Sequence, residues 1–284
     1  MQHGQSTMKA ALMGAAFLFG MGGCADTGSF GGSREIAAWA EARGFSPTKI
    51  DAGPFVLTAQ VRRPPVASET LVVYIEGDGA PWPTPYHPPH DPTPVNPVSL
   101  ALAAADPSAA VVYLGRPCQY LAADALRSCD SAYWTARRFS PEVIAAYADA
   151  VDRMKSSFGA RRLRLAGYSG GGVIAALLAA RRDDVDLLVT VAAPLALAEW
   201  AALHDSTPLT GSLDPVDIGA NVRLPPGVHF AGGRDRIVPL QIVERFARRH
   251  GGRVETLAGF DHECCWARDW AGLLGRLPAA ENSK

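Results

Sequence analysis

Residues 163–178 read LRLAGYSGGGVIAALL, in which an apolar run leads through a glycine-rich corner into a helix-like stretch. The corner, Gly167-Tyr168-Ser169-Gly170-Gly171, matches the G-x-S-x-G pattern, in which a strand turns sharply into a helix. Small flanking residues leave room for a serine to stand strained and exposed at such a corner. The stretch therefore predicts a strand, a tight turn and a helix, with Ser169 as a candidate nucleophile.

Similar apolar runs recur along the chain and alternate with helical patterns. Strands are predicted at residues 55–61, 71–75, 110–114, 163–166, 187–192, 228–231 and 254–257, and helices at 35–42, 98–105, 141–157, 171–180 and 239–250. This alternation is typical of an α/β fold, a mostly parallel sheet with helices on both faces. A chain of 284 residues, 48% of them hydrophobic, suits one such domain, which we place at residues 34–284.

Two segments interrupt the alternation. Residues 81–97 contain eight prolines, and residues 198–226 follow a strand without returning promptly to the next one. Long segments without regular structure are usually functional or disordered, and these two carry enough apolar side chains to pack. We expect ordered loops or lids that wall a pocket.

A nucleophilic serine needs a histidine as base and a carboxylate to orient it, in the chain order serine, acid, histidine. Asp235 lies just beyond the predicted strand 228–231, and His262 lies in the loop after 254–257. Either residue alone could be an ordinary loop side chain or a helix cap. Their order at successive strand ends favours a triad of Ser169, Asp235 and His262.

An oxyanion hole would complete such a site. Its expected donors are the backbone N–H of Gly170 and that of Asp78 or Gly79, in the loop Glu76-Gly77-Asp78-Gly79 after the strand 71–75. A tight turn without a catalytic role would use the same glycines. An ionised Asp78 side chain would oppose the charge that develops on the oxyanion, so it must turn away or be paired.

Together these motifs resemble the α/β-hydrolase superfamily, from about residue 55 to about residue 274. Four segments, residues 74–79, 116–120, 133–135 and 261–266, are similar to a group of exported bacterial hydrolases. The resemblance implies a Ser–Asp–His triad and an acyl-enzyme route without a metal or another cofactor. Glu76 departs from the pattern, because related enzymes carry His-Gly-x-Gly in this loop. The fold hosts many activities and does not specify a substrate.

The sequence thus predicts a serine hydrolase that acts on a small-molecule ester, carboxylesterase-like, with a small or medium acyl group. A peptidase or acyltransferase of the cell envelope stays open as an alternative, as does a non-catalytic lipoprotein that binds a ligand on the same fold. A formal net charge of -1 and scattered arginines disfavour nucleic acid as a partner. The oligomeric state is not predicted.

The amino terminus predicts export. Lys9 precedes an apolar run over residues 10–21, which is too short to cross about 30 Å of hydrocarbon as a helix but suits a secretory signal. Cys24 after Gly22-Gly23 resembles the lipidated cysteine of bacterial lipoproteins, although Met21 stands where leucine is usual. We expect a signal peptide at 1–23, lipidation of Cys24, a tether at 24–33 and a lipid anchor to the membrane at the periplasmic face of the outer membrane. Plain secretion and an uncleaved terminal helix are the alternatives.

Export would expose the other cysteines to an oxidising compartment. We expect a disulfide between Cys118 and Cys129, which would contribute about 3 kcal/mol by closing a short loop. The pairing of Cys264 and Cys265 stays open. No C-x-x-C spacing or paired histidine motif supports a metal site, and the prolines between His87 and His90 favour a fixed loop there.

Overall fold

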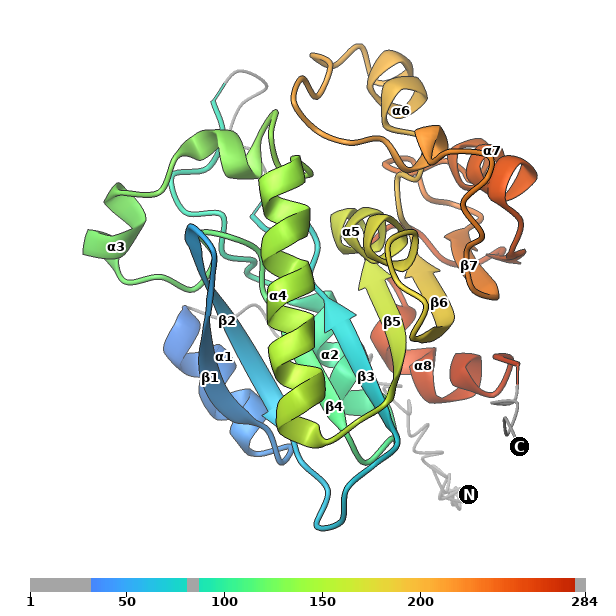
Figure 1. Cartoon of the computed structure of the whole chain (residues 1–284). Helices are drawn as coiled ribbons and strands as arrows, with labels where there is room; N and C mark the ends of the chain where they lie inside the picture. Colours follow the sequence, from blue (N-terminus) through green and yellow to red (C-terminus); the bar gives the residue numbers. More distant parts are fainter. Residues whose placement is uncertain (1–31, 81–86, 279–284) are drawn as a thin grey trace, which may run out of the picture.

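A computed structural model describes residues 32–80 and 87–278, which form an eight-stranded sheet with helices on both faces (Figure 1). The strand order is β1-β2-β4-β3-β5-β6-β7-β8; β2 pairs antiparallel with β1 and β4, and all other neighbours are parallel. The mostly parallel α/β fold predicted from the sequence is confirmed. The strands are β1 (Ser46–Ala52), β2 (Phe55–Arg62), β3 (Thr70–Ile75), β4 (Val111–Leu114), β5 (Arg162–Tyr168), β6 (Val185–Val191), β7 (Gly227–Gly232) and β8 (Arg253–Leu257).

The core lies in two layers because alternate side chains of each strand point to opposite faces of the sheet. In β3, Leu71, Val73 and Ile75 join the cluster beneath α4 and α5, whereas Val72 and Tyr74 join the cluster beneath α1, α2 and α8. Figure 1 shows α4 and α5 crossing one face of the sheet. The helices are α1 (Ser33–Glu41), α2 (Val98–Ala105), α3 (Ala123–Arg127), α4 (Pro141–Phe158), α5 (Gly170–Ala179), α6 (Leu197–Leu203), α7 (Leu240–His250) and α8 (Trp266–Leu274).

Helix α5 fixes the centre of the molecule. It contains only glycine, alanine, valine, isoleucine and leucine, and every one of its residues is buried. A helix that is apolar on all sides is stable only inside a core. Its first residue is Gly170, so the buried helix holds the end of β5 and Ser169 in a fixed place.

Among the helices and strands, β1, α3 and α6 were not predicted from the sequence, and no bounds were predicted for α8. β1 is an edge strand that contains Pro47, Lys49 and Asp51, and only Ile50 and Ala52 in it are buried. Charged residues and proline are usual on an edge, where they discourage pairing with another chain, but they conceal the strand pattern. α6 opens the segment 198–226, which the structure describes completely.

Some predictions fall outside the described residues. These are the signal peptide at 1–23, the lipidation of Cys24, most of the tether, and the part of the proline-rich loop at residues 81–86. They stay predictions from the sequence. Within residues 32–80 and 87–278, no helix is long and apolar enough to span a bilayer.

Candidate active site

Ser169 stands at the corner between β5 and α5, where its φ of 50° places a non-glycine residue in the left-handed region. Its own N–H donates to the carbonyl of Val191 at the end of β6, at 2.8 Å. Side chains would not fit around this corner: a Cβ at Gly167 would overlap the carbonyl of Gly171. A Cβ at Gly171 would in turn overlap the carbonyl of Ile75. The flanking glycines therefore let β5 turn into α5 and present Ser169 at the carboxyl end of the sheet.

A chain of hydrogen bonds links Ser169 to a histidine and a carboxylate. His262 Nε2 lies 3.1 Å from Ser169 Oγ, and His262 Nδ1 lies 2.9 Å from Asp235 Oδ2. The side chain of Asp235 is fully buried, and that of His262 is 17% exposed. Asp235 Oδ1 accepts hydrogen bonds from the backbone N–H groups of Ile237 and Val238, both at 2.8 Å. The structure thus brings together the three side chains that the sequence placed at successive strand ends.

The loop that carries His262 is held from both sides. Tyr168 Oη and Trp266 Nε1 donate hydrogen bonds to the carbonyl of His262, at 3.0 and 2.9 Å. Cys264 and Cys265, whose pairing the sequence left open, form a disulfide with each other. The two hydrogen bonds hold the backbone carbonyl of His262, and the disulfide lies two residues further along the same loop.

A hollow of about 900 Å³ opens beside His262, between the loop after β7 and the loop after β8. Its rim carries exposed charged side chains of both signs, Arg234, Arg236, Asp261 and Glu263. The candidate base is therefore reachable from solvent on this side, through a polar opening.

On the other side of Ser169 lies the predicted oxyanion loop. A Cβ at Gly77 would lie 3.4 Å from the Cβ of Ser169, and a Cβ at Gly170 would overlap Asp78 Oδ1. Asp78 is therefore packed against the residue that follows the nucleophile. Gly79 turns away, with a φ of 96° and its Cα against Pro92 and Gln119. Asp78 and Gly79 were both predicted as possible N–H donors of this loop. Of these two residues, Asp78 is the one whose side chain contacts Gly170.

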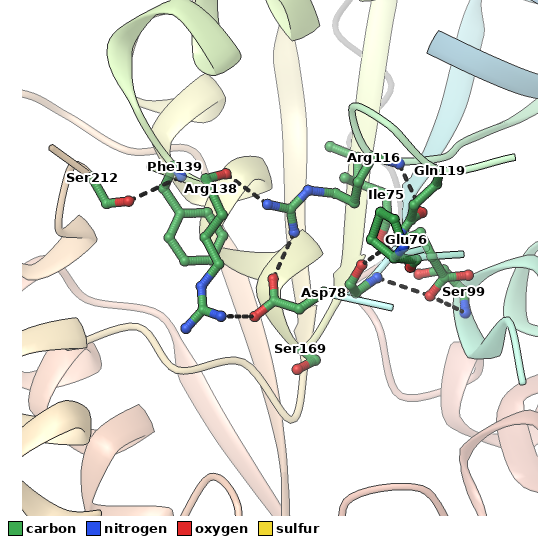
Figure 2. Close-up of polar contacts among 12 residues, drawn as sticks. Ile75, Glu76, Asp78, Ser99, Arg116, Gln119, Arg138, Phe139, Ser169 and Ser212 are labelled. Atoms are coloured by element: carbon green, nitrogen blue, oxygen red, sulfur yellow. Dashed lines mark hydrogen bonds and ion pairs between the residues drawn. The ribbon is translucent and has the colours of Figure 1, made fainter. Parts of the chain in front are cut away.

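The side chain of Asp78 is paired, as the sequence analysis required (Figure 2). Its Oδ1 lies 2.8 Å from Arg116 Nη1, and its Oδ2 lies 3.3 Å from Arg138 Nη1. Burial alone would raise the pKa of Asp78, but Arg138 and Arg116 outweigh burial and hold it below its ordinary value. The carboxylate is thus ionised and bound to the arginines.

Glu76 occupies the place where related enzymes carry histidine. It is 1% exposed, and its Oε1 accepts hydrogen bonds from the N–H groups of Gly77, at 2.8 Å, and Ser99, at 3.3 Å. Burial raises the pKa of Glu76 to about 7, although these hydrogen bonds act in the opposite direction. Glu76 lies beneath the oxyanion loop and braces the peptide that precedes Asp78.

Sequence reasoning did not assign Arg116 and Arg138 to the site. Arg116 follows β4, lies within a motif of the family resemblance and is 3% exposed. Arg138 lies between the short 3-10 turn Ser131–Trp134 and α4, with a side chain that is 10% exposed. Only Arg116 carried a sequence signal, because it lies two residues after a predicted strand; nothing in the sequence marked Arg138.

The remaining predicted positions lie away from Ser169. Cys118 and Cys129 form a disulfide with Cα atoms 6.0 Å apart, packed on Leu126 and Trp134. In the part of the chain that the structure describes, no group of three metal-ligating side chains comes together. The Cys118–Cys129 disulfide supplies no atom to the hydrogen-bond chain of Ser169.

Searches with protein-family models and against curated proteins found no match, but solved structures are similar over most of the chain. An α/β serine hydrolase homologue from Coxiella burnetii is 17% identical, with a TM-score of 0.53 over 80% of this chain and 93% of its own. A serine hydrolase without a lid from Xanthomonas campestris is 17% identical, with a TM-score of 0.53 over 81% and 90%. An esterase from Pyrococcus furiosus is 14% identical, with a TM-score of 0.57 over 81% and 90%. At these identities the likeness shows that the chain has the α/β-hydrolase fold.

Proposed function

We infer that the protein is a serine hydrolase that cleaves esters through an acyl-enzyme intermediate. The inference rests on one observation, the continuous hydrogen-bond chain from Ser169 through His262 to the buried Asp235. A binding scaffold has no physical need for these three side chains in this geometry at the carboxyl end of the sheet. The fold shared with known esterases and serine hydrolases supports the same conclusion.

The geometry gives each residue a role. His262 Nε2 accepts the proton of Ser169 Oγ as the oxygen attacks the ester carbonyl, and Asp235 stabilises the imidazolium that forms. The donors that we propose for the oxyanion are the N–H groups of Gly170 and Asp78. His262 then gives its proton to the departing alcohol, and water attacks the acyl-enzyme by the same steps in reverse order.

A fluorophosphonate probe tests the nucleophile directly. We expect one equivalent of label on Ser169, located by mass spectrometry of the digested protein, together with hydrolysis of short-chain esters. The Ser169→Ala variant should take up no label and should lower turnover by about 10⁴-fold or more. Ser206→Ala is a matched control, since Ser206 is exposed and its hydroxyl donates to the backbone carbonyl of His204, away from Ser169.

The same assay separates the alternatives. Labelling together with faster product release in the presence of an acceptor alcohol would indicate an acyltransferase, and cleavage of amide substrates would indicate a peptidase. A correctly folded protein that neither takes up label nor hydrolyses esters would refute the proposal and would favour a ligand-binding role.

A further inference from the structure

We propose that Arg138, backed by Arg116, binds a carboxylate on the acyl part of the substrate, so that the enzyme acts on monoesters of short dicarboxylic acids. The proposal rests on the proposed hydrolase function and adds a substrate class to it. It follows from the charges, the contacts and the position of two buried arginines beside Ser169.

The first observation is a charge imbalance in a buried place. Arg116 and Arg138 are 3% and 10% exposed at their side chains, and they share one carboxylate, that of Asp78. Among residues 32–80 and 87–278, no other carboxylate forms an ion pair with either arginine. The three ion-paired side chains, two positive and one negative, carry a net charge of about +1 in a largely buried place, where an unpaired charge is costly. Glu76, with a pKa of about 7, offsets this charge only in part near neutral pH. A second anion would remove that imbalance.

The second observation is that the protein uses both terminal nitrogens of Arg116 but only one terminal nitrogen of Arg138. Arg116 Nη1 donates to Asp78 at 2.8 Å, and its Nη2 donates to the backbone carbonyl of Arg138 at 2.6 Å. Arg138 Nη1 reaches Asp78 Oδ2 at only 3.3 Å. The Nε of each arginine is buried without a hydrogen-bond partner, so Nε does not distinguish the two. Figure 2 shows the two guanidinium groups meeting the carboxylate from different directions. Within the described residues, the terminal nitrogen that the protein leaves unused is thus Arg138 Nη2.

The third observation is that the guanidinium of Arg138 is held in place by packing. It lies 5.6 Å from the ring of Phe139 and 5.7 Å from the ring of Trp200, in helix α6. Aromatic rings stabilise a flat cation on its face while leaving the N–H groups at its edge free. A fixed guanidinium edge suits the two oxygens of a carboxylate.

The fourth observation places this cluster on the acyl side of the reaction. β5 carries Ser169; Asp78 follows its neighbour β3, and Arg116 follows β4 beyond it. Asp235 and His262 follow β7 and β8, on the opposite side of β5. The leaving group lies toward His262, because the histidine must protonate it. The acyl chain would then extend away from His262, toward Asp78 and the arginines.

The distance from the nucleophile limits the length of the acyl chain. A Cβ at Gly170, the residue after Ser169, would overlap Asp78 Oδ1 and would lie 2.9 Å from Arg116 Nη1. The charge cluster therefore begins one residue from the serine. A carboxylate bound there would be separated from the ester carbonyl by only a few carbons, as in a glutarate monoester.

The test compares two esters of equal length. We expect the wild type to hydrolyse monoethyl glutarate with a kcat/KM about 10- to 100-fold above that for ethyl valerate, the size of one charged hydrogen-bonding contact. Arg138→Gln keeps hydrogen-bond donors but removes the charge, and it should lower this ratio by about the same factor. Arg137→Gln is the control: it changes the same charge one residue away on a side chain that is 47% exposed and pairs with Glu142, and it should keep the ratio.

Two outcomes would overturn the inference while the hydrolase function stands. In one, the labelled, active wild type shows no preference for the charged ester. In the other, Arg138→Gln lowers the rates for both esters equally, which would mean that the arginines only hold Asp78.

A binding measurement gives a result even if no ester is cleaved. Glutarate should raise the melting temperature of the Ser169→Ala protein, and it should do so less when Arg138→Gln is added. Failure of Ser169 labelling would sink the proposed function, whereas an equal or absent glutarate shift in both proteins would sink the anion site.

Discussion

On the side of Ser169 that holds His262 and Asp235, each side chain lies in the loop directly after its own strand, and the site opens to solvent through a polar hollow. On the side that holds Asp78, three segments far apart in the sequence converge, and the charges of Arg116 and Arg138 are largely buried. We call these the histidine side and the arginine side. They meet at Gly170, against which Asp78 is packed.

This difference separates chemistry from stability. Charges on the rim of the histidine side are solvated, so they can change at little cost to folding. Buried ionised groups on the arginine side must stay paired, because removing one partner leaves the other charge buried and unpaired. We therefore expect substitutions of the rim charges on the histidine side to cost little stability, and substitutions of the buried charges on the arginine side to cost more.

The largest expected effect is on the histidine side. Asp235→Asn retains an Oδ1 that can accept from Ile237 and Val238, but it turns an amide N–H₂ toward His262 Nδ1. The ring must then carry its proton on Nε2, and it can no longer accept the proton of Ser169. We expect kcat to fall by about 10⁴-fold, measured with a short-chain ester, with little change in the midpoint of urea unfolding.

Asp261→Asn is the matched control for this substitution. Asp261 is exposed, lies next to His262 and accepts hydrogen bonds from the N–H groups of Glu263 and Cys264 through Oδ1, which asparagine can replace. Its kcat should stay within about 10-fold of the wild type. Similar kcat losses in the two variants would mean that loop position, and not the tautomer of His262, limits the rate.

The histidine side could be predicted from the sequence because its geometry is local. In a parallel sheet, strand ends meet at one edge, so a residue just after a strand is already placed near the others. Asp235 and His262 needed only that rule and their chain order. Arg138 was not predicted because it follows no strand. Its contact with Asp78 spans 60 residues of sequence, which include α2, β4, α3 and a 3-10 turn.

The helices and strands likewise differ in how well the sequence predicts them. Strands buried on both faces, such as β3, read as continuous apolar runs, and the buried helix α5 has no polar side chain at all. β1 buries only Ile50 and Ala52 at an exposed edge, and α6 has only 7 residues, so neither gives a strong periodic signal. An element that is buried on both sides can be recognised in the sequence, because nearly all of its side chains are apolar.

A smaller effect, on stability, is expected beneath the oxyanion loop. The pKa of Glu76 is about 7 in the folded protein against an ordinary 4.5, so between these values the folded state binds the proton more tightly than the unfolded state. The free energy of unfolding should therefore fall as pH rises from about 4.5 to about 7, by about 3 kcal/mol in all. Glu76→Gln removes this pH dependence. The free energy of unfolding of the variant, relative to that of the wild type, should therefore rise by about 3 kcal/mol between pH 4.5 and pH 8.

The measurement is urea unfolding of both proteins across this pH range, with Glu69→Gln as control. Glu69 is 63% exposed and pairs with Arg161 at the surface, so its substitution should give a difference that varies little with pH. A flat difference for Glu76→Gln as well would show that the carboxyl is solvated in the folded protein and that this part of the arginine side is not tightly packed.

The smallest expected effect concerns Gly170, where the two sides meet. In Gly170→Ala the new methyl group would overlap Asp78 Oδ1, which cannot simply move aside because Arg116 and Arg138 hold both carboxylate oxygens. The strain should lower the free energy of unfolding by about 1–3 kcal/mol. Gly272→Ala, at an open position in α8, should instead raise it by about 0.5–1 kcal/mol, because alanine favours a helix. Opposite signs in urea unfolding would locate a rigid charge cluster beside the nucleophile; a neutral Gly170→Ala would mean that Asp78 and its arginines yield easily, and the contrast between the two sides would disappear.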